Sequence, residues 1–355
     1  MSQTHFCILR PADMLDGAAL SAWCRAGSAP QAFSPWGDHA ALVLDLASTQ
    51  GLADAAHITR WMKTLVCPVI GVRDSARSHC AQTEEALISA ACDVVVDEPE
   101  AADRLLRQIE RNPVAATSFV DLLRVTEHMP IEPALNVESA VYATLQGGAE
   151  YAAWLAGLPE QKPVEAEAGP AVQAERDGDM LRLMLNRPGN RNAMSMAMRD
   201  ALIEVLRLVE ADSSIARVSL QARGSCFSTG GDLSEFGRVP DSASGHLIRL
   251  LAVPGRFLAH VADRVEVHVH GGCIGSGIEF PAFAGHLSAD PKAWFQLPEV
   301  GMGLIPGAGG CVSIARRIGR QRLAWWGLSG KKIRAERALE WGLVDEIRSA
   351  PTSQL

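Results

Sequence analysis

The stretch VEVHVHGGCIGSGIE at residues 265–279 decides the fold class of this chain. Val265, Val267 and Val269 alternate with polar residues, which predicts a strand with one buried face. The glycines that follow predict a tight turn, and a helix is expected to begin near Ser276. Strand, turn and helix in this order form the repeating unit of α/β folds, in which loops at strand ends face the ligand.

Two other segments repeat this order. Alternating leucines at residues 180–186 predict a strand, and the loop RPGNRNAMS follows at residues 187–195. A helix of about four turns is expected after Ser195, which is a suitable N-cap. A further strand around Val218 runs into the glycine element STGGD at residues 228–232. The repetition predicts an α/β architecture for the second half of the chain.

Length, charge and cysteine content restrict the classes of protein that fit. The 355 residues exceed what one compact unit usually needs, so two structural units are expected. The formal net charge of −8 gives no reason to expect nucleic acid or an acidic membrane surface as a partner. The eight cysteines include no CxxC pair, so we expect neither a metal site nor a redox dithiol, and a cytoplasmic location fits best.

Two glutamates lie in separate glycine-bearing segments downstream of STGGD. Glu279 ends GSGIE at residues 275–279, and Glu299 lies in LPEVGMGLIPGAGG at residues 297–310. Glycine turns expose backbone N–H groups that can stabilise a developing oxyanion. Two separately held carboxylates can move protons to and from adjacent carbons. The combination favours acyl-thioester chemistry.

Five segments in the same order resemble the crotonase, or enoyl-CoA hydratase/isomerase, superfamily. They are NRPGNRNAM, SCFSTGGDL, HGGCIGSGIE, FQLPEVGMGLIPGAGG and RALEWGLVDEI. The resemblance implies an α/β fold with a crotonase-like spiral of ββα units in the C-terminal half, assembled as a homo-oligomer, a trimer or a hexamer. It implies an acyl-CoA thioester as substrate and no separate cofactor, because coenzyme A is part of the substrate. Neither nucleic acid nor a membrane is expected as a partner.

The same resemblance assigns the catalytic residues. Gly231 and Ser276 fall where backbone N–H groups form the family's oxyanion hole. Glu279 and Glu299 match the two glutamates of hydratases, in which the first activates water for attack at C3 and the second delivers a proton to C2. Retention of both favours an enoyl-CoA hydratase. Enoyl-CoA isomerisation, acyl-CoA hydrolysis and a non-catalytic acyl-CoA-binding subunit stay open as alternatives.

Four more residues are candidates for substrate binding by this resemblance. The backbone at Ala193 is expected near the adenine of coenzyme A, and Arg187 or Arg191 near phosphate, because the planar guanidinium suits phosphate. Asp232 is expected to order the oxyanion turn through local backbone bonds.

The order of segments along the chain departs from the family. In the family, helices that cover the acyl pocket follow the segment matching RALEWGLVDEI, whereas here similar helices at residues 112–159 precede the core. We therefore predict a degenerate crotonase-like α/β region at 1–105, a helical segment at 106–160, a linker at 161–171 and the crotonase-like catalytic core at 172–350. An unrelated N-terminal domain is the alternative. Whether the helices cover the site of their own chain or of a neighbouring one stays open.

Overall fold

The computed structural model describes residues 14–27, 30–73, 83–159 and 168–349. It divides into two compact units. Unit 1 comprises Met1–Glu127 and Arg320–Ser329, and unit 2 comprises His128–Gly319 and Gly330–Leu355. Most of the linker predicted at 161–171 lies outside the described residues. Within the described ranges, every helix is too short or too polar to cross a membrane.

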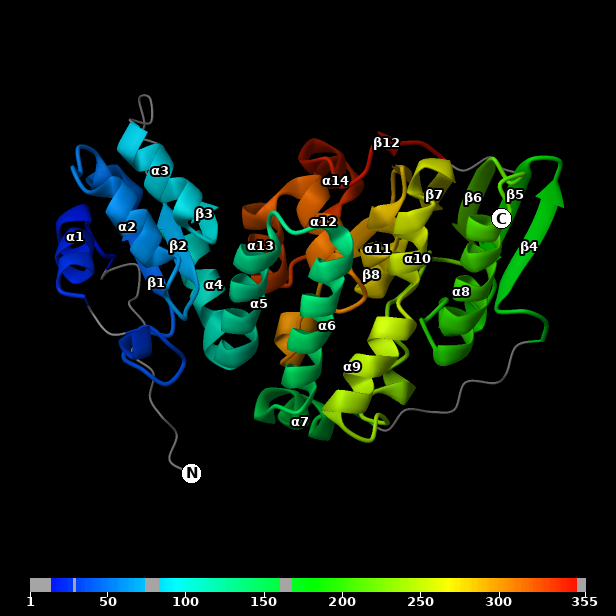
Figure 1. The fold of residues 1–355 in the computed structure, drawn as a ribbon, viewed down its shortest axis with the longest axis horizontal. Helices are drawn as coiled ribbons and strands as arrows, with labels where there is room; N and C mark the ends of the chain where they lie inside the picture. The colour runs from blue at the N-terminus through cyan, green and yellow to red at the C-terminus, as the bar shows by residue number, and fades with distance from the viewer. Residues whose placement is uncertain (1–13, 28–29, 74–82, 160–167, 350–355) are drawn as a thin grey trace. The chain divides into compact units, whose positions relative to one another are not determined.

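Unit 1 is built on a three-stranded parallel sheet (Figure 1). Its strands are β1 (Leu42–Asp45), β2 (Val69–Val72) and β3 (Val94–Val96), in the order β1-β2-β3. The strands are almost continuously apolar, which is typical of parallel strands buried on both faces. The helices of this unit are α1 (Gly17–Arg25), α2 (Ala55–Met62), α3 (Thr83–Ala91), α4 (Pro99–Arg111), α5 (Pro113–Thr126) and α13 (Arg320–Ser329). The origin of this unit as a degenerate crotonase half stays a prediction.

A buried ion cluster holds α5 and α13 in unit 1. Asp93, directly before β3, accepts hydrogen bonds from the backbone N–H of Val69 at 2.8 Å, Nε of Arg124 at 2.8 Å and Nη1 of Arg320 at 3.1 Å. Only 1% of Asp93 is exposed, so its charge depends on both arginines for compensation.

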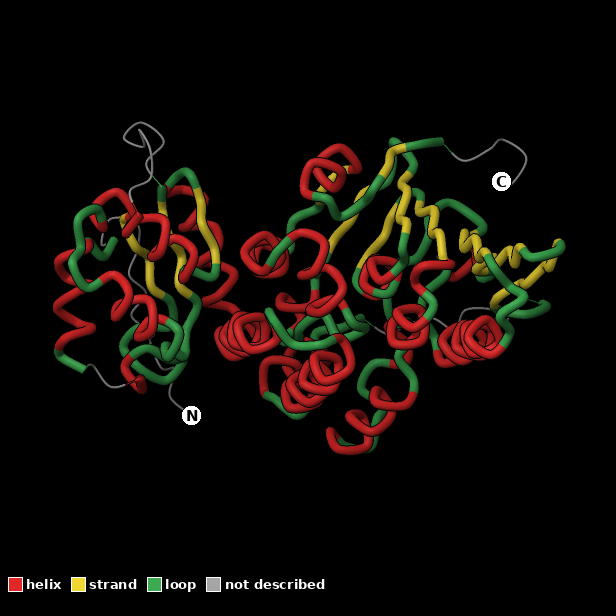
Figure 2. The backbone as a smooth tube through the Cα atoms, turned by 45° about the horizontal axis from the view of Figure 1, so that its top comes forward, coloured by secondary structure: helices red, strands yellow, loops and turns green. Residues whose placement is uncertain are grey.

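Unit 2 contains two sheets, whose strands are yellow in Figure 2. The larger has the order β12-β9-β7-β6-β5-β4, and the smaller has the order β11-β10-β8. In the larger sheet only the β4–β5 pair is antiparallel. The strands are β4 (Val172–Asp177), β5 (Met180–Leu185), β6 (Arg217–Ala222), β7 (Val265–Val269), β8 (Gly272–Ile274), β9 (His286–Ala289), β10 (Trp294–Gln296), β11 (Ile333–Arg334) and β12 (Glu346–Ile347).

The local sequence explains the first elements of unit 2. Leu181, Leu183 and Leu185 of β5 are each at most 4% exposed, as their alternation predicts. Helix α8 (Met196–Ala211) begins directly after Ser195, whose side chain accepts a hydrogen bond from the backbone N–H of Met198. The predicted strand, loop and capped helix are therefore confirmed.

Two successive ββα units build the walls of the site. The first runs through β7, β8 and α11 (Ser276–Glu279), and the second through β9, β10, the 3-10 helix η8 (Glu299–Met302) and α12 (Gly310–Ile318). In each unit the first strand joins the larger sheet and the second joins the smaller one, where β8 and β10 pair in parallel. The predicted crotonase-like α/β fold is confirmed. The parallel pairing brings the residues after β8 and β10 to the same place.

Four more helices complete the part of unit 2 that surrounds the site. They are α6 (Ile131–Gln146), α7 (Ala149–Ala156), α9 (Ser242–Leu251) and α10 (Pro254–His260), and α14 (Ala335–Trp341) lies near the C-terminal end. Helix α6 packs against α9 and α12 (Figure 1), and α7 packs against η8. The helices at residues 131–156 therefore cover the core of their own chain in this structure.

Candidate active site

A cavity of about 280 Å³ in unit 2 contains four of the residues singled out from the sequence. Glu279, Glu299, Gly231 and Ser276 all line it. The two glutamates come from different ββα units, and the parallel β8–β10 pair explains why they meet.

Glu279 is held rigidly at the end of α11. Only 2% of it is exposed, and its Oε2 atom accepts hydrogen bonds from the backbone N–H groups of Ala308 at 2.7 Å and Gly310 at 3.0 Å. A Cβ atom at Gly310 would lie 2.6 Å from Cγ of Glu279, so only glycine permits this approach. Oε1 has no part in these two bonds and is left for a substrate or water.

Glu299 approaches the same point from η8. A Cβ atom at Gly275 would lie 2.4 Å from Oε1 of Glu299 and 3.8 Å from Oε1 of Glu279, so both carboxyl groups face this glycine. Gly275 has φ of 50°, in the region that L-residues rarely adopt. The Oε2 atom of Glu299 is buried and has no hydrogen-bond partner among the described residues.

The surroundings raise the pKa of both glutamates. Burial raises the pKa of Glu279 to about 7, against the opposing effects of the two backbone N–H donors and of the Arg249 charge. Burial, and then the charge of Glu279, raise the pKa of Glu299 well above its usual value. The charge of Glu279 opposes ionisation of Glu299, so the two carboxyl groups titrate as an interacting pair. Two carboxyl groups with raised pKa values are thus available for proton transfer in the same cavity.

A third carboxyl group, Glu138 of α6, supports this pair. It is 2% exposed and accepts hydrogen bonds from the backbone N–H groups of Gly309 at 2.7 Å and Cys311 at 2.9 Å. Glu138 and Glu279 together satisfy four successive N–H groups at the start of α12, which would otherwise be buried without acceptors. Burial, and then the charge of Glu279, raise the pKa of Glu138 well above its usual value.

Glu138 was not identified from the sequence. It lies 171 residues from Gly309 in the chain and belongs to no local motif. The sequence offers one signal for Glu138, namely that this charged residue lies on the apolar side of a predicted amphipathic helix. Such a position is typical of a buried, paired carboxyl group.

The two residues expected to form an oxyanion hole, Gly231 and Ser276, both line the cavity. Ser276 is the first residue of α11, and Gly231 follows Gly230, which has φ of 87°. Neither N–H has a hydrogen-bond acceptor within the part of the chain that the structure describes. Because backbone N–H groups are strong donors, both are available to an oxygen atom of a ligand.

The residues expected near coenzyme A do not line this cavity, although the chain neighbour of one of them does. Arg187 donates to the backbone oxygens of Gly169, Pro170 and Asn186, at distances between 2.7 and 3.0 Å. Arg191 is exposed with φ of 50°, and Ala193 is buried next to Met194, which does line the cavity. The roles of these three residues stay predictions.

Asp232 makes the local bonds expected of a residue that orders a turn. Its side chain accepts from the backbone N–H of Ser234 at 2.9 Å, from Oγ of Ser234 at 2.7 Å and from Nδ2 of Asn190 at 2.9 Å. These bonds join the oxyanion turn to the loop at residues 187–195. They hold the pKa of Asp232 below its usual value, despite its burial.

Comparison with known proteins places this chain in a family. The profile described as enoyl-CoA hydratase/isomerase matches residues 175–355. The 2,3-dehydroadipyl-CoA hydratase of Escherichia coli is 30% identical over 178 residues, which are 48% of this chain and 67% of that protein. The trans-2-decenoyl-[acyl-carrier-protein] isomerase of Streptococcus mutans is 27% identical over 175 residues, 48% of this chain and 66% of that protein.

Solved structures give a match of similar extent. An enoyl-CoA hydratase from Thermoplasma volcanium is 30% identical, with a TM-score of 0.46 over 51% of this chain and 73% of that one. The chain thus spans about two thirds of the length of the two curated relatives.

Proposed function

The chain belongs to the enoyl-CoA hydratase/isomerase family, and from this premise we propose that it adds water across the C2=C3 bond of a 2-enoyl-CoA thioester. The observation that carries the proposal is the pair Glu279 and Glu299, which face one glycine and whose pKa values are both raised by burial. In the proposal, one carboxyl group of the pair is ionised and the other is protonated, so together they supply a base and an acid.

In the proposed reaction, the thioester oxygen accepts hydrogen bonds from the backbone N–H groups of Gly231 and Ser276. Ionised Glu279 takes a proton from water as the water oxygen bonds to C3, and the electrons of the double bond move onto the thioester oxygen. Protonated Glu299 then gives its proton to C2 as the enolate collapses. One proton is taken and one is given, so transfer between the two carboxyl groups restores the site. Each oxyanion donor typically contributes about 10²–10³ in rate.

Double-bond isomerisation is the second candidate, because a single carboxyl group can move a proton between C2 and C4. The Streptococcus mutans relative carries the name of an isomerase. Glu279 favours hydration, because its ionised Oε1 atom would have no role in an isomerisation carried out by Glu299 alone.

The proposal extends to the rest of the substrate and to the assembly. Coenzyme A enters as part of the substrate and no separate cofactor is required, with Ala193, Arg187 and Arg191 as the residues expected near it. A homo-oligomer, a trimer or a hexamer, is the proposed assembly. Acyl-CoA hydrolysis and binding without turnover are the outcomes that would replace hydration.

The test follows the conjugated enoyl-thioester absorbance with short, medium, branched and aromatic 2-enoyl-CoAs. Loss of absorbance with the product mass of one added water is expected for the wild type. Glu279→Gln and Glu299→Gln should each lose about 10²–10⁴ in kcat/KM, the usual contribution of general acid–base groups. Glu204→Gln, which removes an exposed carboxylate of α8, is the matched control. A product of unchanged mass would favour isomerisation.

A further inference from the structure

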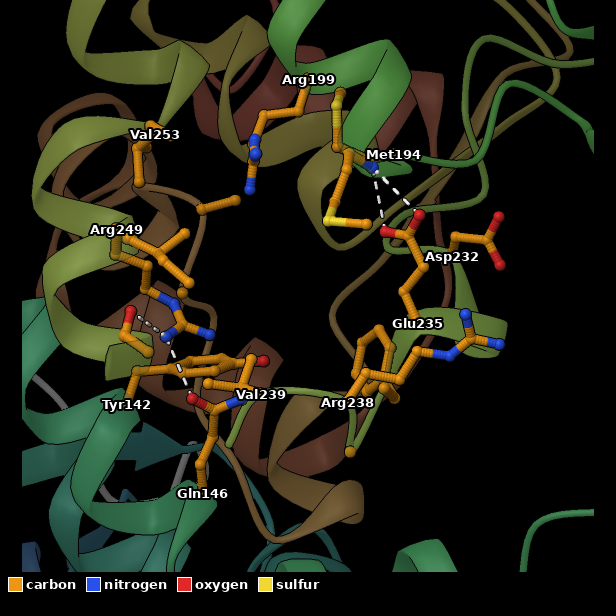
Figure 3. A pocket seen from close by; sticks show the side chains of 18 of the residues that line it. Tyr142, Gln146, Met194, Arg199, Asp232, Glu235, Arg238, Val239, Arg249 and Val253 are labelled. Carbon is orange, nitrogen blue, oxygen red and sulfur yellow. Dashed lines mark hydrogen bonds between the residues drawn. The ribbon is translucent and has the colours of Figure 1, made fainter. Parts of the chain in front are cut away.

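A second cavity, of about 360 Å³, adjoins the one that contains the glutamates. Figure 3 shows the side chains that line this second cavity. We call it the arginine pocket, since Arg199, Arg238 and Arg249 line it. The two cavities share the lining residues Tyr142, Met194, Phe236, Arg249, Gly307 and Ala308. The two cavities are therefore neighbours, and their shared boundary is where the acyl group of a substrate held at Glu279 and Glu299 would approach the arginine pocket.

Most of the remaining lining is apolar. Met194, Met196, Phe236, Val239, Ile248, Val253 and Pro254 all contribute. Such walls suit methylene groups, and the shared residues place the continuation of an acyl chain here. A purely hydrocarbon acyl chain would not require cationic side chains among these apolar walls for its binding.

Arg249 of α9 is the cation at the junction of the two cavities. Its guanidinium carbon lies 3.7 Å from the ring centroid of Tyr142, which holds the group flat. Its Nη1 atom donates to Oε1 of Gln146 at 3.0 Å and to the backbone oxygen of Gly245 at 3.1 Å. Over the ranges that the structure describes, Nε and Nη2 of Arg249 have no hydrogen-bond acceptor. Figure 3 shows the guanidinium directed into the cavity.

Three other charged groups of the arginine pocket, Glu235, Asp232 and Arg199, already have partners. Both oxygens of Glu235 accept from the backbone N–H of Met196, and Asp232 is bonded to Ser234 and Asn190. Arg199 is paired with Asp200, at 2.7 Å from Nε to Oδ1.

Arg238 is exposed at the rim of the pocket. The charge of Arg249 also opposes the effect of burial, which raises the pKa values of Glu279 and Glu138. Among the charged groups that line both cavities, Arg249 is therefore the cation with donors left without acceptors in the described residues.

From this arrangement we propose that the acyl group of the substrate ends in a carboxylate, which Nε and Nη2 of Arg249 bind in the arginine pocket. This inference rests on the proposed function and adds the class of acyl group, a dicarboxylic acid attached to coenzyme A through one end. A guanidinium fixed against an aromatic ring presents two parallel donors, which is the geometry a carboxylate requires. The apolar walls hold the methylene groups between the two ends.

Saturated thioesters test the inference without turnover, with adipyl-CoA compared against hexanoyl-CoA by titration calorimetry. The two probes have the same chain length and the same coenzyme A, so their difference isolates the distal carboxylate from the phosphates. We expect the wild type to bind adipyl-CoA at least about 10-fold more tightly, the low end for hydrogen bonds to a charged group. Arg249→Met should abolish this preference and Arg249→Lys should keep part of it.

Two control variants separate recognition from structure. Gln146→Met removes the bond between α6 and α9 but leaves the cation, so the preference for adipyl-CoA should remain. Arg182→Met removes an exposed arginine of β5 and matches the change in net charge.

An equal loss of affinity for both thioesters in Arg249→Met would mean that Arg249 binds a coenzyme A phosphate or only fixes α9, and would overturn the inference. Equal binding of both thioesters by the wild type would also overturn it and leave hydration intact. Failure to bind either thioester would overturn the proposed function and the inference together.

Discussion

The raised pKa of Glu279 predicts a measurable cost to folding at neutral pH. Burial raises this pKa from 4.5 to about 7, so the folded protein binds the proton more tightly than the unfolded chain does. As the pH rises from below 4.5 to above 7, the unfolded chain loses the proton first, and the free energy of unfolding falls. The difference in pKa corresponds to about 3 kcal/mol, all of which is lost above pH 7.

Replacement of Glu279 by Gln should remove this loss. Both hydrogen bonds to Glu279 end on Oε2, from Ala308 and Gly310, so one amide oxygen can accept both. The free energies of unfolding of the wild type and of Glu279→Gln are to be measured in denaturant between about pH 5 and pH 8. The variant should gain about 2–3 kcal/mol on the wild type over this range.

Most other ionisable groups are common to the wild type and Glu279→Gln and cancel in the comparison. Glu204→Gln provides the control for loss of an exposed charge. A difference between wild type and Glu279→Gln that stays constant from pH 5 to pH 8 would refute the assignment of a raised pKa to Glu279.

Three further predictions concern the same cavity. The pH dependence of kcat/KM for a 2-enoyl-CoA should rise with an apparent pKa of about 7, as Glu279 ionises, and fall at higher pH, where Glu299 loses its proton; a profile that is flat around pH 7 would contradict this. Glu138→Ala should leave the N–H groups of Gly309 and Cys311 without acceptors, at about 1–3 kcal/mol each in the free energy of unfolding, and Glu138→Gln should lose less because one oxygen remains. Gly275→Ala should reduce kcat by at least about 10²-fold, since the added Cβ would lie 2.4 Å from Oε1 of Glu299, whereas Gly178→Ala, with similar φ and open space, controls for backbone strain.

The local elements of unit 2 were predictable because their signals are short-range. The alternation in β5 and the Ser195 cap of α8 depend on neighbouring residues, and the structure confirms both. Glu279 and Glu299 could be named as a pair from their motifs, although only the parallel pairing of β8 and β10 shows how they meet.

Three features of the site depend on contacts between distant segments, which no local pattern in the sequence reveals. Glu138 reaches the start of α12 from a helix that precedes the core in sequence. In the sequence, Arg249 cannot be distinguished from other polar residues of an amphipathic helix. The structure singles it out, because α6 places the ring of Tyr142 against its guanidinium. Arg187 matches a motif position, but the backbone oxygens of residues 169 and 170 occupy its guanidinium, and these contacts follow from the path of the chain before β4.

The central claim is that a water oxygen is added at C3 of an enoyl thioester by the Glu279 and Glu299 pair. Its most direct test is the mass of the product formed from a 2-enoyl-CoA in heavy-oxygen water. We predict a 3-hydroxyacyl-CoA that carries one labelled oxygen in its acyl part and retains coenzyme A, formed about 10²–10⁴ times more slowly by Glu279→Gln and by Glu299→Gln. Label found only in a free carboxylic acid, or an unlabelled isomer of the substrate, would contradict the account.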